Sequence, residues 1–209
     1  MEILVQEPID LSQVADLAAV GIERTTPTPR DGSKWHVTSL LRSGHRIAKG
    51  DVGYEDNRAF PDDILAIMAL GRIWETTVDC FLTDYADCRG GLYVSDVESV
   101  TDGIIASLDG LMWLPDMGWM VAETKLRYTL NENIPSDHIQ QVRAYCHCAD
   151  TNLVCYVSGH ISTAPPTVRA RLRILRLTRQ SIEECWQGII NTRDYLVAQG
   201  CGPNDGRGE

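Results

Sequence analysis

Residues 104–127 constrain the fold more than any other stretch, because they are typical of two strands joined by a tight turn. The predicted strands are Ile104–Asp109 and Trp119–Arg127, and the segment Leu114–Gly118 between them contains the turn formers Pro, Asp and Gly. If the turn is centred on Asp116, positions whose numbers sum to twice 116, or 232, lie opposite one another. The turn therefore predicts the register of the hairpin.

Three charged residues converge in this hairpin. The register puts Asp109 across from Glu123, and the strand period of two puts Lys125 on the same face as Glu123. Two carboxylates held so close repel each other unless a cation or a proton lies between them. Oxygen ligands at this density suit Mg²⁺ or Mn²⁺, which keep several waters and share their coordination with a phosphate. The alternative is an exposed cross-strand salt bridge.

The composition is that of a soluble globular protein, with 209 residues of which 44% are hydrophobic and 23% charged. No apolar run approaches the roughly 18 residues of a membrane span, and the N-terminus lacks a basic region, so no membrane contact and a cytoplasmic location are expected. Seven Cys without regular spacing argue against a disulfide framework and for reduced thiols.

The order of the remaining elements predicts an α/β fold with a mixed central sheet flanked by helices. Helices are expected at residues 8–22, from Thr38 or Ser39 onward, and at Pro61–Tyr85, Ser136–Ala149 and Thr178–Ala198; further strands are expected at residues 91–100, 153–158 and 167–177. Residues 1–34 are predicted to form an N-terminal helix and linker, residues 35–198 one domain, and residues 199–209 a flexible tail.

Glu75 falls within the apolar stripe of the helix predicted at Pro61–Tyr85, nearly aligned with Met68 and Leu82. Burying a carboxylate without a partner is strongly unfavourable. Glu75 is therefore expected to meet an arginine, a proton or a metal, and a structural ion pair is as good an explanation as a functional one.

The succession of an Asp, a variable gap and then Glu-x-Lys on the next strand resembles the PD-(D/E)XK nuclease superfamily. Here the motif residues are Asp109, Glu123 and Lys125. Glu-x-Lys alone is a weak signal. It gains weight in a chain with only three Lys, and from the hairpin that carries it.

Further signatures resemble the branch that contains the RecB nuclease domain, lambda-type exonuclease and related phage nucleases. These are Gly71 followed four residues later by Glu75, Gln141 followed four residues later by Tyr145, and, more loosely, His36 near the start. The signatures occur in the right order between about residues 35 and 195. The resemblance implies a restriction-endonuclease-like core, which agrees with the predicted order of elements.

The same resemblance implies a Mg²⁺-dependent DNA nuclease, with Mn²⁺ able to substitute. An exonuclease of DNA recombination or processing, of the phage type, is favoured; the alternatives are a structure-specific endonuclease and a catalytically inactive DNA- or protein-binding module. A homo-oligomer and a recombination partner protein are both left open. No iron–sulfur cluster is expected, because the Cys positions do not match those of the relatives that hold one.

The roles implied by the resemblance fall on eight residues. Metal binding is assigned to Asp109, Glu123, the carbonyl of Thr124 and, directly or through water, Glu75; Lys125 orients the attacking water and stabilises charge or accepts a proton; Gln141 and Tyr145 steady the metal waters or the substrate phosphate; His36 contacts DNA or, as the favoured alternative, caps or packs its helix.

Arginines in the strand predicted at residues 167–177 are candidates for binding DNA. Arg169, Arg171 and Arg173 alternate with apolar residues, so one face of the strand is expected to be core and the other a row of guanidinium groups. A chain with a net charge of −10 needs a local positive surface to approach DNA, and this row supplies one. A solvated edge strand protected by its charges is an equally good explanation.

Overall fold

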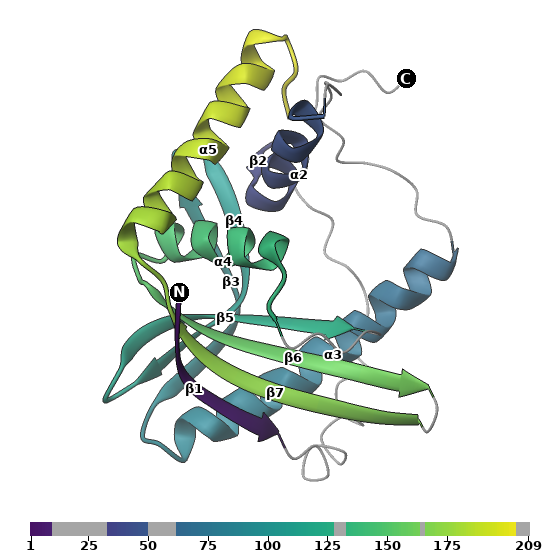
Figure 1. Cartoon of the computed structure of the whole chain (residues 1–209), viewed down its shortest axis with the longest axis vertical. Coiled ribbons are helices and arrows are strands. Elements are labelled where there is room, and N and C mark those ends of the chain that lie inside the picture. Colours follow the sequence, from purple (N-terminus) through teal and green to yellow (C-terminus); the bar gives the residue numbers. More distant parts are fainter. Residues whose placement is uncertain (10–32, 50–61, 128–132, 164–165, 204–209) are drawn as a thin grey trace.

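A seven-stranded mixed sheet organises the part of the chain that the computed structural model describes, which is residues 1–9, 33–49, 62–127, 133–163 and 166–203 (Figure 1). The strand order is β1-β7-β6-β5-β4-β2, with β3 also paired to β4. The elements are β1 (Glu2–Ile9), β2 (Trp35–His36), α2 (Val37–Ile47), α3 (Asp62–Asp87), β3 (Leu92–Thr101), β4 (Ile104–Leu114), β5 (Gly118–Arg127), α4 (Ser136–Cys148), β6 (Leu153–Thr163), β7 (Pro166–Arg176) and α5 (Arg179–Ala198).

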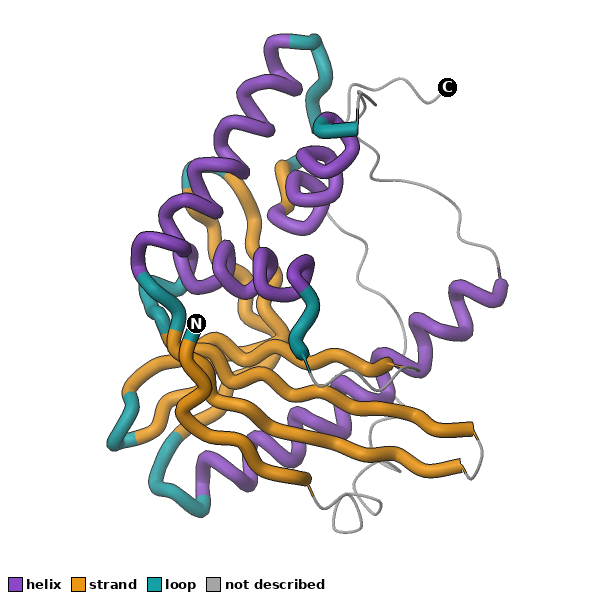
Figure 2. The backbone as a smooth tube through the Cα atoms, in the orientation of Figure 1, coloured by secondary structure: helices purple, strands orange, loops and turns teal. Residues whose placement is uncertain are grey.

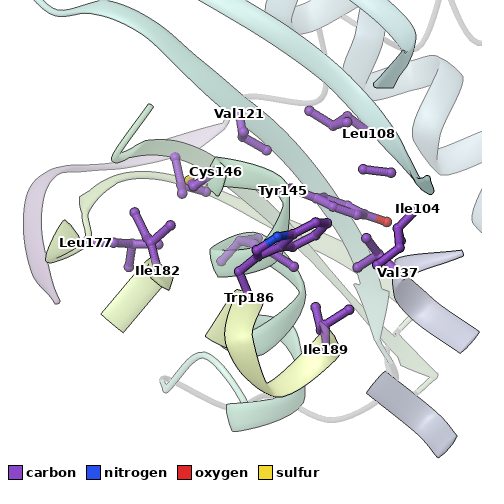
Figure 3. Packing of buried hydrophobic residues seen from close by; sticks show 14 of the residues in the cluster. Val37, Ile104, Leu108, Val121, Tyr145, Cys146, Leu177, Ile182, Trp186 and Ile189 are labelled. Atoms are coloured by element: carbon purple, nitrogen blue, oxygen red, sulfur yellow. The ribbon is translucent and has the colours of Figure 1, made fainter. Parts of the chain in front are cut away.

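The predicted fold class is confirmed, since helices flank a mixed sheet on both faces (Figure 2). On one face, α2, α4 and α5 bury Tyr145 among residues that include Ile104, Leu108 and Val121 (Figure 3). On the other face, α3 packs the buried side chain of Trp74 in a cluster with residues of β4 to β7. Each fully buried large apolar side chain contributes about 1.5–3 kcal/mol, so these two clusters hold the layers together.

The predicted register of the central hairpin is confirmed. The strands β4 and β5 pair from Leu114 with Gly118 to Gly110 with Ala122, and each of these pairs sums to 232. The ladder stops there. Beyond this point β4 continues to pair with β3, while β5 pairs in parallel with β6. The two central strands therefore part between the pair Gly110–Ala122 and the next residues, Asp109 and Glu123.

The N-terminal prediction was wrong at its start, because residues 8 and 9 end a strand rather than begin a helix. Strand β1 runs antiparallel to β7, with Gln6 beside Arg173 and Pro8 beside Arg171. Proline is tolerated at position 8 because β1 is an edge strand, in which every second backbone N–H points away from the sheet and forms no ladder hydrogen bond. The rest of the predicted helix and nearly all of the linker, residues 10–32, lie outside the described residues, as do residues 50–61 and the end of the tail at 204–209.

Close approach of α3 to the sheet requires a glycine at position 159. A Cβ atom on Gly159 would lie 2.6 Å from the ring of Trp74, closer than real Cβ contacts allow. Gly159 thus points toward α3, and its neighbours Ser158 and His160 point to the opposite face of the sheet.

Among the helices of the described ranges, none combines the length and apolar character needed to cross a bilayer.

Candidate active site

Asp109 occupies the point at which β4 and β5 part. Its Oδ2 atom accepts a hydrogen bond from the backbone N–H of Thr124 at 2.7 Å. This bond fixes the carboxylate beside the backbone of β5, where the strand-to-strand ladder has ended. The residue opposite Asp109 in β3 is Asp96, whose φ of 53° lies in the left-handed region that Asp tolerates better than most residues.

Glu123 and Lys125 lie together on the next strand, as the strand period predicts. Glu123 is 1% exposed, and its Oε1 atom accepts a hydrogen bond from Nζ of Lys125. Its other oxygen, Oε2, is buried without a hydrogen-bond partner among the described residues. An unsatisfied buried acceptor costs about 1–3 kcal/mol. The Oε2 atom of Glu123 is therefore a buried acceptor that a hydrogen-bond donor or a cation would stabilise.

Burial and mutual repulsion raise the pKa of each carboxyl group in this cluster. Burial, followed by the charge of Asp109, raises the pKa of Glu123 to about 8. Burial raises the pKa of Asp109 as well, against the opposing effects of Lys125 and the Thr124 N–H. Burial lowers the pKa of Lys125, but Glu123 and Asp109 outweigh that effect and raise it above its ordinary value. Lys125 is thus an ammonium ion in this structure.

Glu75 on α3 lies near these carboxylates, but it does not lie in the buried apolar stripe of the helix, where the helical pattern places it. The buried stripe of α3 contains Trp74, Val78 and Leu82, whereas the side chain of Glu75 is exposed on the wall of a cavity. The helix is rotated so that Trp74 packs against Gly159, which turns Glu75 toward the cavity. Desolvation, followed by the charge of Asp109, raises the pKa of Glu75 to about 7.

Gln141 and Tyr145 lie on one face of α4, as predicted. Nε2 of Gln141 donates to Oη of Tyr145 at 2.9 Å, and both residues line the same cavity as Glu75 and Asp109. Tyr145 is only 2% exposed, so its ring belongs to the core and its hydroxyl end is anchored by the amide. Their roles toward a metal water or a phosphate stay predictions.

The cavity has a volume of about 1950 Å³ and two walls of different charge. The wall formed by α3 and the sheet is mixed, with Asp96, Asp109 and Glu75 beside Arg72 and Lys125. The facing wall comes from α2, which contains no acidic residue, and from the segment before it; this group, the α2 wall, consists of Lys34, Arg42, His45 and Arg46. His36 also lines the cavity; it is 3% exposed and is the N-cap residue of α2, without a side-chain capping bond.

Three residues that the sequence analysis did not single out form a chain beside Lys125. Nη2 of Arg127 lies 3.1 Å from Nε2 of His138, and Nδ1 of His138 lies 2.6 Å from Oη of Tyr156. Because a guanidinium only donates, Nε2 accepts and Nδ1 carries the proton donated to Tyr156. Burial, followed by the charge of Arg127, lowers the pKa of His138 to about 4, so the imidazole stays neutral. Tyr156 is the register partner of Glu123, and that parallel pairing has no local sequence signal.

The predicted row of arginines is only partly exposed. Arg169 is exposed and Arg171 is half-buried, but Arg173 is 3% exposed and its Nε atom donates to Oε1 of Gln6 at 3.1 Å. Strand β1 pairs with this part of β7 and places Gln6 beside Arg173. Arg173 therefore does not belong to an exposed row, and contact of Arg169 and Arg171 with DNA stays a prediction.

The donor set of the site fits Mg²⁺ better than a metal that needs a complete protein cage. Within the described ranges, no group of three or more His, Cys, Asp or Glu side chains is arranged to hold a metal ion. Mg²⁺ is usually held by one or two carboxylates, with waters and substrate phosphates completing its shell. Asp109 and Glu123 supply such a pair, and the buried Oε2 of Glu123 is an oxygen in need of a positive partner.

The chain matches no family model and no curated protein, but it resembles solved structures at low sequence identity. SSO0001 is 13% identical with a TM-score of 0.46, and 88% of this chain and 87% of that chain are covered. LHK-Exo, an alkaline exonuclease from Laribacter hongkongensis, is 16% identical with a TM-score of 0.45, and its complex with dAMP gives 14% and 0.47; both cover 80% of this chain and 89% of that chain.

Proposed function

We propose that this chain is a Mg²⁺-dependent nuclease that hydrolyses the phosphodiester bonds of DNA. The observation that supports this most is the meeting of Asp109, Glu123 and Lys125 where β4 and β5 part. A structural salt bridge would need one carboxylate for the one ammonium. This site holds a second, half-buried carboxylate beside the buried one and leaves one oxygen of the buried carboxylate without a partner.

Asp109, Glu123 and the carbonyl of Thr124 would hold the metal, and Glu75 would do so directly or through water. When bound, Mg²⁺ supplies Lewis-acid activation of the phosphate and of a water near neutral pH. The hydrogen bond from Thr124 leaves the Oδ1 atom of Asp109 to act as ligand while Oδ2 keeps the side chain in position. Mn²⁺ has the same preference for oxygen ligands and is expected to substitute.

Lys125 orients the attacking water and stabilises the negative charge that develops on the phosphate. The carboxylates of Glu123 and Asp109 raise its pKa, which favours the ammonium form of the side chain. A fixed cation in a site sheltered from water contributes more than it would in bulk solvent. Of the two roles implied by the family resemblance, the charge-stabilising one is the better supported.

DNA is the proposed substrate because the cavity is large and one wall is cationic. A volume of about 1950 Å³ exceeds the roughly 300–1,000 Å³ of sites for small ligands, which favours a polymer over a single nucleotide. The chain as a whole carries a charge of −10, so cations gathered in the α2 wall are conspicuous. Phosphate contacts from Lys and Arg supply most of the sequence-independent affinity for nucleic acid.

The test compares linear with circular DNA, each with Mg²⁺ or with EDTA. The signatures formed by Glu75, Gln141 and Tyr145 favour an exonuclease, so loss of the linear DNA alone is expected, and only with Mg²⁺. Nicking of the circles would replace the exonuclease with an endonuclease. If neither substrate is cut while DNA is still bound, the catalytic proposal is rejected in favour of a binding module.

A further inference from the structure

Charged residues of β5, β6 and β7 lie in two rows on one face of the sheet. In the first row Lys125 is opposite Ser158, and Ser158 is opposite Arg171. In the second row, the same registers place Arg127, His160 and Arg169 opposite one another. Residues directly opposite in paired strands project to the same face. The rows therefore connect the ammonium of the candidate site with the two arginines of β7.

This face is the one that turns away from α3. Gly159 separates Ser158 from His160 and points at Trp74, so both of those neighbours lie on the other side of the sheet. On β7, Ala170 and Leu172 pack in the α3 cluster, which turns Arg169 and Arg171 to that other side as well. In Figure 1 the ends of β5, β6 and β7 extend beyond α4 and α5. Within the rows, α4 reaches Arg127 through His138, whose Nε2 atom lies 3.1 Å from Nη2 of Arg127, whereas Arg169 on β7 is exposed.

The face is accessible, and its charged residues apart from Glu123 are basic. Arg169 is exposed, and Lys125, Arg127, His160 and Arg171 are half-buried. A third row joins Glu123, Tyr156, Arg173 and Gln6. In the three rows Glu123 is the only acidic residue. Such a surface in a chain of net charge −10 is complementary to a polyanion.

We propose that Arg127, His160, Arg169 and Arg171, here called the β5–β7 face, bind the backbone of DNA that extends from the candidate active site. The proposal rests on the proposed function, whose site it continues. It replaces a track along β7 with one that crosses three strands and omits the buried Arg173. The α2 wall binds the substrate on the other side of the carboxylates, so the two cationic surfaces flank the position of cleavage.

The spacing of the strands sets which phosphates this face reaches. Neighbouring strands lie about 4.8 Å apart, so the backbone of β7 is about 10 Å from that of β5. Successive nucleotides of one strand advance about 3.4 Å along duplex DNA. Arg169 and Arg171 are therefore expected to contact phosphates about three nucleotides from the one beside Lys125.

The test compares two double variants that remove the same charge. In Arg169→Gln/Arg171→Gln the β5–β7 face is neutralised; in Arg176→Gln/Arg179→Gln two exposed arginines elsewhere are neutralised, which contact Glu2 and Asp150. Binding to a labelled DNA of about 20 nucleotides is followed by fluorescence anisotropy in EDTA over a salt series. Losing two phosphate contacts is expected to reduce the slope of log K against log salt by about 1.4–1.8 in the first variant only.

Equal slopes in the two double variants, or a wild-type chain that does not bind DNA, overturn the proposal. Cleavage by the wild type with Mg²⁺ is measured separately. If the slope changes as expected but the wild type does not cut DNA, the β5–β7 face is supported as a DNA-binding surface and the nuclease function is rejected. If the wild type cuts DNA but the two slopes are equal, the nuclease function is supported and the β5–β7 face is rejected. Should the first double variant unfold, Arg169→Gln alone, at an exposed position, is expected to reduce the slope by about half as much.

Discussion

The backbone N–H of Thr124 donates to Oδ2 of Asp109 over 2.7 Å, directly beyond the last paired residues of β4 and β5. The side chain of Asp109 thus accepts a backbone hydrogen bond from β5 at the place where β4 and β5 diverge. This bond brings a carboxylate of one strand against the backbone of the next and leaves Glu123 buried beside it. The chemistry proposed for the chain follows from that arrangement.

Replacing Lys125 by Ala is expected to lower the rate of DNA cleavage by at least about a hundredfold, the usual effect of losing a fixed group that stabilises charge. Binding of DNA and the overall fold should change little, because Lys125 is at the edge of the core and its side chain is 26% exposed. Single-turnover cleavage and circular dichroism give the two readouts. Activity within about tenfold of wild type would refute the catalytic role.

Replacing Glu75 by Gln is expected to raise the Mg²⁺ concentration needed for half-maximal cleavage. The carboxylate lies on the cavity wall near Asp109, so its loss should weaken binding of the cation without removing a core contact. Asp84→Asn on the same helix is the matched control, since Asp84 is exposed and does not line the cavity. An equal shift of the Mg²⁺ midpoint in both variants, or unfolding of Glu75→Gln alone, would count against a metal role.

The stability of the metal-free chain should fall as the pH rises from about 5 to about 8. Glu123 has its pKa raised from 4.5 to about 8, so the folded state holds this proton more tightly than the unfolded state does. The stabilisation is complete below pH 4.5 and is lost as the pH rises toward 8; Glu75, raised to about 7, acts in the same direction, whereas His138, lowered from 6.5 to about 4, opposes both below about pH 6.5. Lys125, whose pKa is raised above 10.5, contributes equally throughout this window.

Thermal unfolding in EDTA across this range measures the effect. Glu123→Gln should flatten most of the dependence, since an amide does not titrate, and Mg²⁺ should restore stability chiefly near pH 8, where the carboxylate is ionised. An unfolding temperature in EDTA that is constant from about pH 5 to about pH 8 would mean that Glu123 is not held as the structure shows.

Gly159→Ala is expected to destabilise the fold by about 1–3 kcal/mol, because its Cβ atom would lie 2.6 Å from the ring of Trp74. The same substitution at Gly188, an exposed position in α5 with no atom within 4 Å of the added Cβ, should stabilise by about 0.5–1 kcal/mol. Chemical denaturation of the two variants measures both signs. A neutral Gly159→Ala would show that α3 lies farther from the sheet.

The local features of the site were predictable because turn chemistry and strand period are properties of neighbouring residues. The turn around Asp116 predicts the register of β4 and β5 correctly, and the spacing of Gln141 and Tyr145 predicts that they share one face of α4. The relation of Glu75 to its helix was not predictable in this way. Its neighbour Trp74 packs against Gly159, which is far away in the sequence and invisible to a helical wheel.

Pairing between distant strands was the other limit. Strand β1 pairs with β7 across more than 160 residues, and this contact buries Arg173 against Gln6. A pattern of alternating residues shows that Arg173 lies on the face with Arg171, but it does not show what covers that face. The parallel register that places Tyr156 beside Glu123, and the contact of Tyr156 with His138 of α4, are non-local for the same reason.

The divergence of β4 and β5 beyond the pair Gly110–Ala122 also links metal binding at the site to the stability of the fold. On the side of Asp109 and Glu123, no ladder hydrogen bond joins the two strands beyond the pair Gly110–Ala122. A cation bound by both Asp109 and Glu123 would therefore connect β4 and β5 at this point. Ligand that binds only the folded state adds free energy according to its concentration and affinity. Backbone amides flanking this point should then exchange with deuterium more slowly when Mg²⁺ is added, which makes the sheet itself a reporter of whether the site is filled.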